Sequence, residues 1–152
     1  MNFKPEITEQ DFKACLTAAE QGDSNAMYLI GYCYCWGQGT RTNRKRAVTW
    51  WSKAAKQGHV EAQYWLGACY EAGLGVPEDA ETALKWLRKS AESGNQSAQI
   101  KIVFHYLFPL QRAISALITR EEAEKYCNMA AAQGNCFAAM CLSRFKQDKF
   151  NT

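Results

Sequence analysis

The sequence predicts an all-α fold, a curved solenoid of αα hairpins with about eight helices. Three observations support this prediction: a unit of 36 residues recurs along the chain, its apolar residues fall at helical spacing, and glycines and capping residues mark the helix ends. A lone hairpin cannot bury its apolar side, so the copies must stack to share a core. We expect residues 1–152 to form a single domain.

The repeat is clearest in two copies that begin at Ala26 and Ala62. A third copy begins at Ala98, and its second half follows at 40 residues instead of 36, so four residues are inserted between Pro109 and Leu117. We therefore divide the chain into a half-repeat at 8–22, repeats at 24–58, 60–94 and 96–134, and a half-repeat at 136–147. The first two copies share Tyr28/Tyr64, Gly31/Gly67, Cys33/Cys69, Tyr34/Tyr70, Gly37/Gly73 and Gly39/Gly75.

Each copy reads as two helices, because its apolar residues recur at intervals of three and four. In the first copy the predicted buried stripes are Ala26, Ile30, Cys33 and Tyr34 in the first helix and Ala47, Trp50 and Ala54 in the second. We expect helices at 8–21, 24–36, 43–57, 60–72, 79–93, 96–108, 119–133 and 136–147.

Helix ends are marked by residues suited to them. Thr119 and Glu122 have the spacing of a capping box, in which each side chain bonds the backbone of the other residue. A glycine in the left-handed conformation is favoured where the second helix of each copy ends, and this predicts that role for Gly22, Gly58, Gly94 and Gly134.

Charge and hydropathy argue against several classes of protein. The net charge of +3, from 18 Lys and Arg against 15 Asp and Glu, is too small for a general nucleic-acid binder. The chain begins without the apolar core of a signal peptide, and its longest apolar stretch is too short to span a bilayer. We expect a cytoplasmic protein that does not enter membranes; a periplasmic or secreted location would require that a leader had been removed.

Neither metal nor cofactor chemistry is expected from the cysteines and histidines. The seven cysteines include no C-x-x-C pair, so we expect reduced thiols packed as small apolar side chains. Cys33, Cys69 and His105 share one repeat position, but neighbouring helices about 8–10 Å apart hold such residues too far apart for one metal ion or a disulfide. No phosphate loop, H-E-x-x-H motif or nucleophile elbow is present, so we predict no enzyme activity.

The copy from Ala62 to Gly94, with its Gly75-Val-Pro-Glu-Asp79 segment, resembles the Sel-1-like repeat, a relative of the tetratricopeptide repeat. The resemblance covers roughly residues 12 to 147. It implies a right-handed αα solenoid, commonly bacterial, that serves as an adaptor or scaffold. Some members are exported with cysteines paired within each repeat, but the cysteines here do not follow that placement.

In solenoids of this type the first helix of each hairpin lines the concave face. Counting from the buried stripe, we predict that outward-facing residues of these helices bind a protein or peptide, because rigid aromatic side chains dominate many interfaces. For Phe104 and Phe108 the alternative is that they cover the irregular third loop as core. The candidate groove residues are Tyr28, Tyr32, Cys35, Trp36, Tyr64, Glu71, Phe104 and Phe108.

A basic cluster of Arg41, Arg44 and Arg46 follows the first predicted hairpin turn. It suits an acidic partner surface, although a solvated loop at a helix start explains the same charges. Interleaved basic and aromatic residues also leave single-stranded nucleic acid as a less favoured alternative.

Two roles in protein binding stay open on the sequence: an adaptor in a larger assembly, or an immunity protein that neutralises a toxin. An empty aromatic groove also favours self-association.

Overall fold

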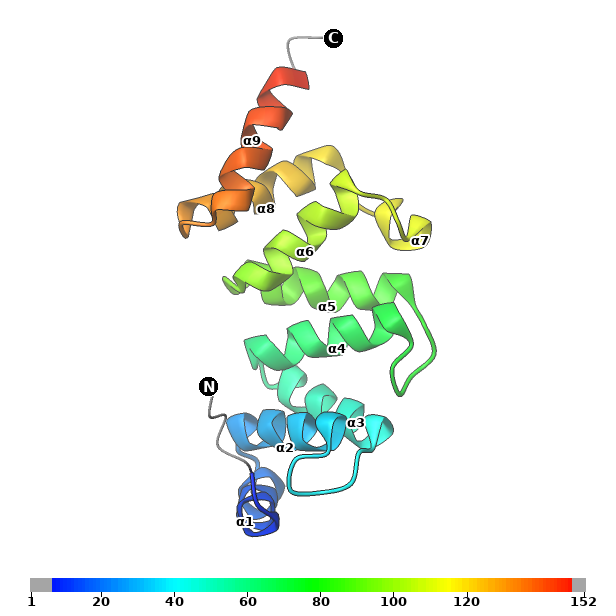
Figure 1. Ribbon diagram of the computed structural model, residues 1–152, viewed down its shortest axis with the longest axis vertical. Coiled ribbons are helices and arrows are strands. Elements are labelled where there is room, and N and C mark those ends of the chain that lie inside the picture. The colour runs from blue at the N-terminus through cyan, green and yellow to red at the C-terminus, as the bar shows by residue number, and fades with distance from the viewer. Residues whose placement is uncertain (1–6, 149–152) are drawn as a thin grey trace, which may run out of the picture. The chain divides into compact units, whose positions relative to one another are not determined.

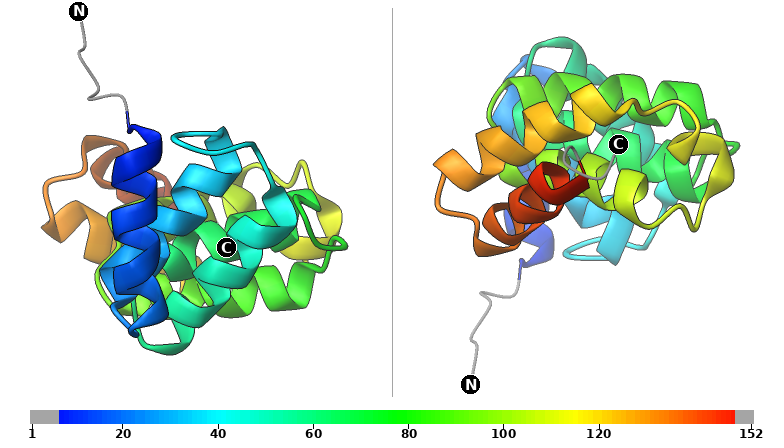
Figure 2. Two further views of the ribbon diagram at one scale, coloured as in Figure 1. Left: turned by 90° about the horizontal axis from the view of Figure 1, so that it is seen from below. Right: turned by 90° about the horizontal axis from the view of Figure 1, so that it is seen from above.

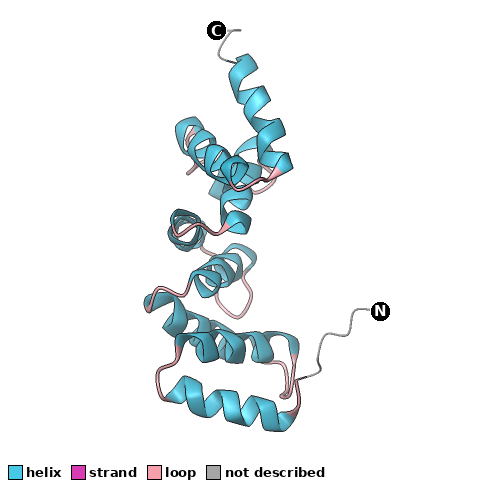
Figure 3. Ribbon diagram, turned by 90° about the vertical axis from the view of Figure 1, so that its left-hand side faces the viewer, coloured by secondary structure: helices cyan, strands magenta, loops and turns pink. Residues whose placement is uncertain are grey.

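A computed structural model describes residues 7–148, and these residues form helices and connecting loops without any strand (Figures 1 and 3). The helices expected from the sequence are all present, with ends that differ from the predicted ones by at most one residue. The helices are α1 (Glu9–Glu20), α2 (Ser24–Trp36), α3 (Arg44–Lys56), α4 (Val60–Ala72), α5 (Ala80–Glu92), α6 (Gln96–Leu107), α7 (Arg112–Ser115), α8 (Arg120–Ala132) and α9 (Cys136–Asp148).

The chain divides into two compact units at the boundary between Glu78 and Asp79. The first unit holds α1 to α4 and the second holds α5 to α9. The expectation of one domain over residues 1–152 stays a prediction.

In the first unit consecutive helices pack in pairs, α1 on α2, α2 on α3 and α3 on α4. The shared core contains Phe12, Ile30, Trp51 and Leu66, each at most 7% exposed. Burying side chains of this size contributes about 1.5–3 kcal/mol each, so packing of the apolar stripes is the main force that joins these helices.

Trp51 holds the core position for which the sequence analysis named Trp50, and that part of the predicted stripe is wrong. Trp51 is fully buried, whereas Trp50 is half-buried with the Lys53 ammonium 4.2 Å from its ring. Gly31 makes room for Trp51, because a Cβ at Gly31 would lie 2.5 Å from the indole. Small and large residues on facing helices thus interlock.

The loop between α2 and α3 folds back on the start of α1 (Figure 2, left). Gly37 ends α2 in the left-handed conformation, at φ 70°. Gly39, at φ 65°, lies so close to Thr8 that a Cβ would be 2.5 Å from the Thr8 carbonyl oxygen. Only glycine satisfies both the backbone conformation and the close approach at this position.

In the second unit α5 packs on α6, α6 on α8 and α8 on α9. The inserted residues form the short helix α7, which makes nine helices among the described residues where about eight were predicted. Ile114 of α7 is 2% exposed, and α7 packs against α5 and α6. The insertion therefore adds to the core of this unit.

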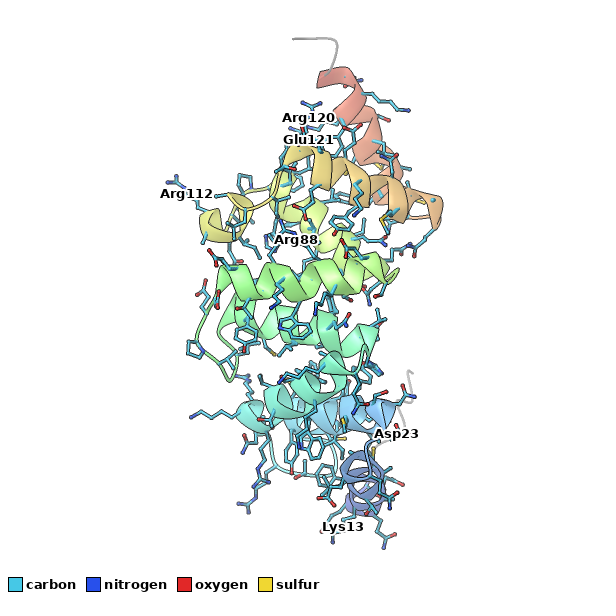
Figure 4. The ribbon with its side chains drawn as sticks, turned by 180° about the vertical axis from the view of Figure 1, so that it is seen from behind. Lys13, Asp23, Arg88, Arg112, Arg120 and Glu121 are labelled. Atoms are coloured by element: carbon cyan, nitrogen blue, oxygen red, sulfur yellow. The ribbon has the colours of Figure 1, made fainter. Side chains whose placement is uncertain are left out.

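The predicted capping box at Thr119 is wrong in its second half. The Thr119 hydroxyl accepts a hydrogen bond from the Glu122 backbone N–H at 3.2 Å, as expected of an N-cap. The Glu122 carboxylate instead accepts two hydrogen bonds from Arg88 of α5, one of them from Nη2 at 2.7 Å. Figure 4 labels Arg88. A bidentate charged partner has displaced the local backbone contact.

Candidate functional site

The first unit carries an aromatic face built by α2 and α4, which we define as Tyr28, Tyr32, Trp36, Tyr64 and Trp65. Trp36 is at its centre: its ring lies 4.4 Å from Tyr32 and 5.0 Å from Trp65. Tyr64 meets Trp65 edge-on at 5.4 Å. These contacts join the two helices through aromatic side chains.

Trp51 supports the aromatic face from the core. Its ring stacks on Trp65 at 5.8 Å and meets Trp36 at 5.9 Å. The Trp51 indole N–H donates to the Tyr28 carbonyl oxygen at 3.1 Å, which fixes the ring plane. Trp36 nevertheless stays 42% exposed, whereas the other four residues of the face are half-buried, so the face presents to solvent a tryptophan ring that its neighbours hold in place.

His59 borders the aromatic face at the start of α4. Its ring stacks on Tyr28 at a centroid distance of 4.8 Å and an interplanar angle of 19°. Its Nδ1 accepts from the Ala62 backbone N–H at 3.1 Å, which makes His59 the N-cap of α4. Nε2 therefore carries the proton and donates to Asn25 Oδ1 at 3.1 Å.

The two ends of the aromatic face differ in charge. Burial raises the pKa of Tyr28; a hydrogen bond from Trp65 opposes this rise, and the nearby Glu61 carboxylate adds to it. At the other end burial raises the pKa of the Cys35 thiol, and the Arg44 guanidinium opposes the rise. The charged neighbour is thus acidic at Tyr28 and basic at Cys35.

The structure brings together four of the predicted groove residues, namely Tyr28, Tyr32, Trp36 and Tyr64, through contacts with Trp65 or with one another. Cys35 and Glu71 lie on the same two helices and are half-buried. Their role in binding stays a prediction.

Phe104 and Phe108 lie in the second unit. They are 42% and 41% exposed, so the alternative that they form core is wrong. Their rings contact each other at 4.9 Å.

The three predicted arginines have different neighbours in the first unit, and their joint role in binding stays a prediction. Arg41 lines a cavity beside α1, and Arg46 donates from Nη1 to the Tyr34 hydroxyl at 3.1 Å. Burial raises the pKa of the Cys35 and Cys69 thiols, and the nearby Arg44 guanidinium opposes this rise.

Sequence reasoning missed Trp65 and Trp51. Trp65 shares its repeat position with Leu29 and Lys101, so the comparison of copies gave it no signal. Helical spacing could have found it, because Trp65 is four residues after Glu61 and three before Ala68, both on the outward side of α4.

None of the seven cysteines forms a disulfide in the structure, and four of them are buried as small apolar side chains: Cys33, Cys69, Cys127 and Cys141. Burial raises the pKa of Cys33 to about 11 and that of Cys69 to about 12. Across residues 7–148 no group of three or more His, Cys, Asp or Glu side chains has the arrangement of a metal site. None of the described helices is long and apolar enough to cross a bilayer.

Stacked αα hairpins with an exposed aromatic face define a helical-repeat protein of the class that mediates protein–protein interaction. The Sel1 repeat matches at residues 24–59, 60–95 and 120–135, which is more than half of the chain. The chain belongs to the Sel1 repeat family.

Solved structures support this assignment. A Sel1 repeat protein from Oxalobacter formigenes is 33% identical, with a TM-score of 0.80 over 90% of this chain and 55% of its own. The protective antigen c5321 of uropathogenic Escherichia coli is 28% identical, with a TM-score of 0.76 over 88% of this chain and 28% of its own. The chain thus spans about half or less of the length of these two proteins.

A third structure, the immunity protein Pa5087 from Pseudomonas aeruginosa, is 22% identical, with a TM-score of 0.57 over 86% of this chain and 47% of its own. This likeness shows the fold alone. A search of curated proteins found no match. The all-helical repeat architecture predicted from the sequence is confirmed.

Proposed function

We propose that the aromatic face binds a segment of a protein partner, and that this is the main function of the first unit. The observation that carries the proposal is Trp36, which is 42% exposed although it contacts three other aromatic rings. An exposed tryptophan held in place loses little side-chain entropy when a partner covers it.

Membership of the Sel1 repeat family supports a protein as the partner, and the charges at the two ends support an orientation. A segment lying along α2 and α4 would place basic groups near Glu61 and acidic groups near Arg44. Anchoring side chains on the partner would be aromatic or aliphatic, because they cover the rings of Trp36 and Trp65.

The test uses a displayed peptide library selected on the unaltered protein, followed by fluorescence anisotropy with the selected peptides. The variant Tyr32→Ala/Trp36→Ala removes the exposed Trp36 ring and the half-buried Tyr32 ring that contacts it. We expect its Kd to rise by about 30-fold or more, which corresponds to about 2 kcal/mol and is typical of buried aromatic anchors.

The matched control is Phe104→Ala/Phe108→Ala. These residues hold the same repeat positions two copies later, and Phe108 is 41% exposed against 42% for Trp36, so the variant removes an aromatic pair of the same kind. We expect less than about a threefold change in Kd for this variant. Equal losses in both variants, or no loss in the first, would refute the aromatic face as the binding site. Circular dichroism of each variant verifies the fold.

The adaptor and the immunity roles predict different partners for the same face. An adaptor retains its partner in an assembly with further proteins, whereas an immunity protein abolishes the toxicity of the protein it binds. Co-expression of a captured partner with the unaltered chain and with Tyr32→Ala/Trp36→Ala separates the roles, because only an immunity protein rescues growth.

A further inference from the structure

A second surface of the first unit, between α1 and α3, consists of two adjoining cavities that share Leu16. One has a volume of about 340 Å³ and the other about 490 Å³. We call this pair the α1–α3 cleft. Tyr34 of α2 and Trp50 of α3 line the first cavity, and Phe12 of α1 lines the second. The cleft therefore combines an apolar lining with polar walls.

The charges on the walls are predominantly basic. Helix α3 carries five basic and no acidic residues in Arg44–Lys56. Arg46 and Lys53 line the first cavity, and Lys13 and Arg41 line the second. Each cavity thus presents two cations.

Two of these cations are held in place by aromatic rings. The Arg46 guanidinium lies 5.5 Å from the centre of the Tyr34 ring and donates to its hydroxyl. The Lys53 ammonium lies 4.2 Å from the centre of the Trp50 ring. Cations immobilised in this way lose less entropy on binding an anion than freely rotating side chains do.

Two acidic residues also line the cleft, and they decide what kind of anion fits. Glu9 pairs with Lys13 at 2.7 Å in the second cavity, and Glu20 lines the first. A continuous phosphate backbone would pass both carboxylates, which disfavours nucleic acid. Separate carboxylates on a polypeptide can avoid them and still reach the basic side chains.

We propose that the α1–α3 cleft binds an acidic protein segment in which an apolar side chain lies between acidic residues. The apolar side chain would cover Leu16, and the carboxylates on either side would approach Arg41 and the Arg46–Lys53 pair. This surface is separate from the aromatic face, so the first unit can contact two partner segments of different chemistry. The inference does not depend on the function proposed for the aromatic face.

The probes are fluorescein-labelled peptides in which a Leu or Phe lies between two pairs of Glu, with the spacing between them varied. Counterpart peptides carry Gln in place of every Glu. At low ionic strength we expect anisotropy titrations to give at least one acidic peptide a Kd about tenfold or more below that of its counterpart.

The variant Arg46→Gln/Lys53→Gln should raise the Kd of this peptide by about five- to tenfold, as expected for the loss of two partly exposed charge pairs. The control Lys85→Gln/Lys89→Gln removes the same charge from α5, and Lys89 contacts Trp86 at 4.9 Å much as Lys53 contacts Trp50. We expect less than a twofold change for the control. Lys13→Gln/Arg41→Gln is the second test variant, should the first prove misfolded by circular dichroism.

Three results would overturn the proposal. In the first, no acidic peptide binds better than its Gln counterpart. In the second, the α5 control weakens binding as much as the cleft variants do. In the third, an oligothymidylate competes for the cleft and binds more tightly than the peptides. Retention of the acidic peptide by Tyr32→Ala/Trp36→Ala would support the separate cleft, whatever the outcome for the aromatic face.

Discussion

The two units carry aromatic pairs at the same repeat positions, yet the pairs rest on different supports. Tyr32 and Trp36 lie 4.4 Å apart in the first unit, and Phe104 and Phe108 lie 4.9 Å apart in the second. Exposure of the second aromatic residue is almost the same, 42% for Trp36 and 41% for Phe108. The exposure of Trp36 and Phe108 alone therefore does not distinguish the two surfaces.

What differs is the core residue behind each pair. Trp51 supports Trp36 in the first unit, and the corresponding repeat position in the second unit is Cys127. On the facing helix the side chain is larger in the second unit, because Val103 stands where the first unit has Gly31. Both positions are buried in both units. A large residue against glycine and a small residue against valine are two solutions to the same packing problem.

The largest effect should come from removing the support itself. Trp51→Ala deletes a fully buried ring, so we expect a loss of about 3–5 kcal/mol in the free energy of unfolding. Cys127→Ala, which removes only a sulfur atom at the corresponding position, should cost far less. Urea denaturation monitored by circular dichroism compares the two. Similar losses would show that Trp51 does not hold the aromatic face in place.

The next effect tests whether the two packing solutions are interchangeable. Gly31→Val introduces the residue of the second unit, and its Cβ would lie 2.5 Å from Trp51, so we expect a loss of about 1–3 kcal/mol. In Gly31→Val/Trp51→Cys the large ring is gone. We expect this double variant to be at least about 1 kcal/mol more stable than the sum of the single changes predicts. Additive losses would refute the compensation.

The sequence was sufficient to predict the repeat architecture, because the 36-residue offset and the glycines at helix ends are local signals. Gly22, Gly58, Gly94 and Gly134 all have positive φ in the structure, as predicted. The sequence was insufficient for the choice between Trp50 and Trp51. Adjacent residues on a helix differ by only 100° in direction, so small errors in the predicted stripe exchange them.

Only part of the candidate site could be predicted, because the sequence indicates directions around one helix but not contacts between helices. Outward positions on one helix follow from helical spacing, which led to Tyr28, Tyr32 and Trp36. Contacts between helices do not follow from spacing, and such contacts place Trp65 in the aromatic face. The α7 helix was missed because four residues give no recognisable periodicity.

A smaller effect should appear in the second unit, where an ion pair joins α5 to α8. Arg88 contacts Glu122 and also donates from Nη2 to the Leu117 carbonyl oxygen at 3.0 Å. Because Arg88 is partly exposed and water screens the pair, Glu122→Gln should cost only about 1 kcal/mol. The loss should shrink in high salt, whereas that of Trp51→Ala should not. Denaturation at two salt concentrations tests this; a salt-independent loss would contradict it.

The smallest effect is the loss of stability at low pH, which should differ between the two units because their helix caps differ. His59 caps α4 with an unprotonated nitrogen, whereas Asn95, which caps α6 through a 2.8 Å bond to the Ala98 N–H, does not titrate. Burial lowers the pKa of His59; Glu61, the backbone and Asp23 oppose this shift. The folded state therefore binds fewer protons than the unfolded chain, and stability rises with pH in this window.

The contribution of neutral His59 is thus fully present above its unfolded pKa of about 6.5 and is lost as the pH falls through the lower folded value. We expect a loss below about 1 kcal/mol between pH 7 and pH 5, the size of one helix cap. His59→Asn introduces the cap residue of α6 and should remove this part of the pH dependence. Urea denaturation of both proteins at each pH measures the difference. If His59→Asn keeps the full acid sensitivity, the titrating group lies elsewhere and the cap of α4 is not protonated in this range.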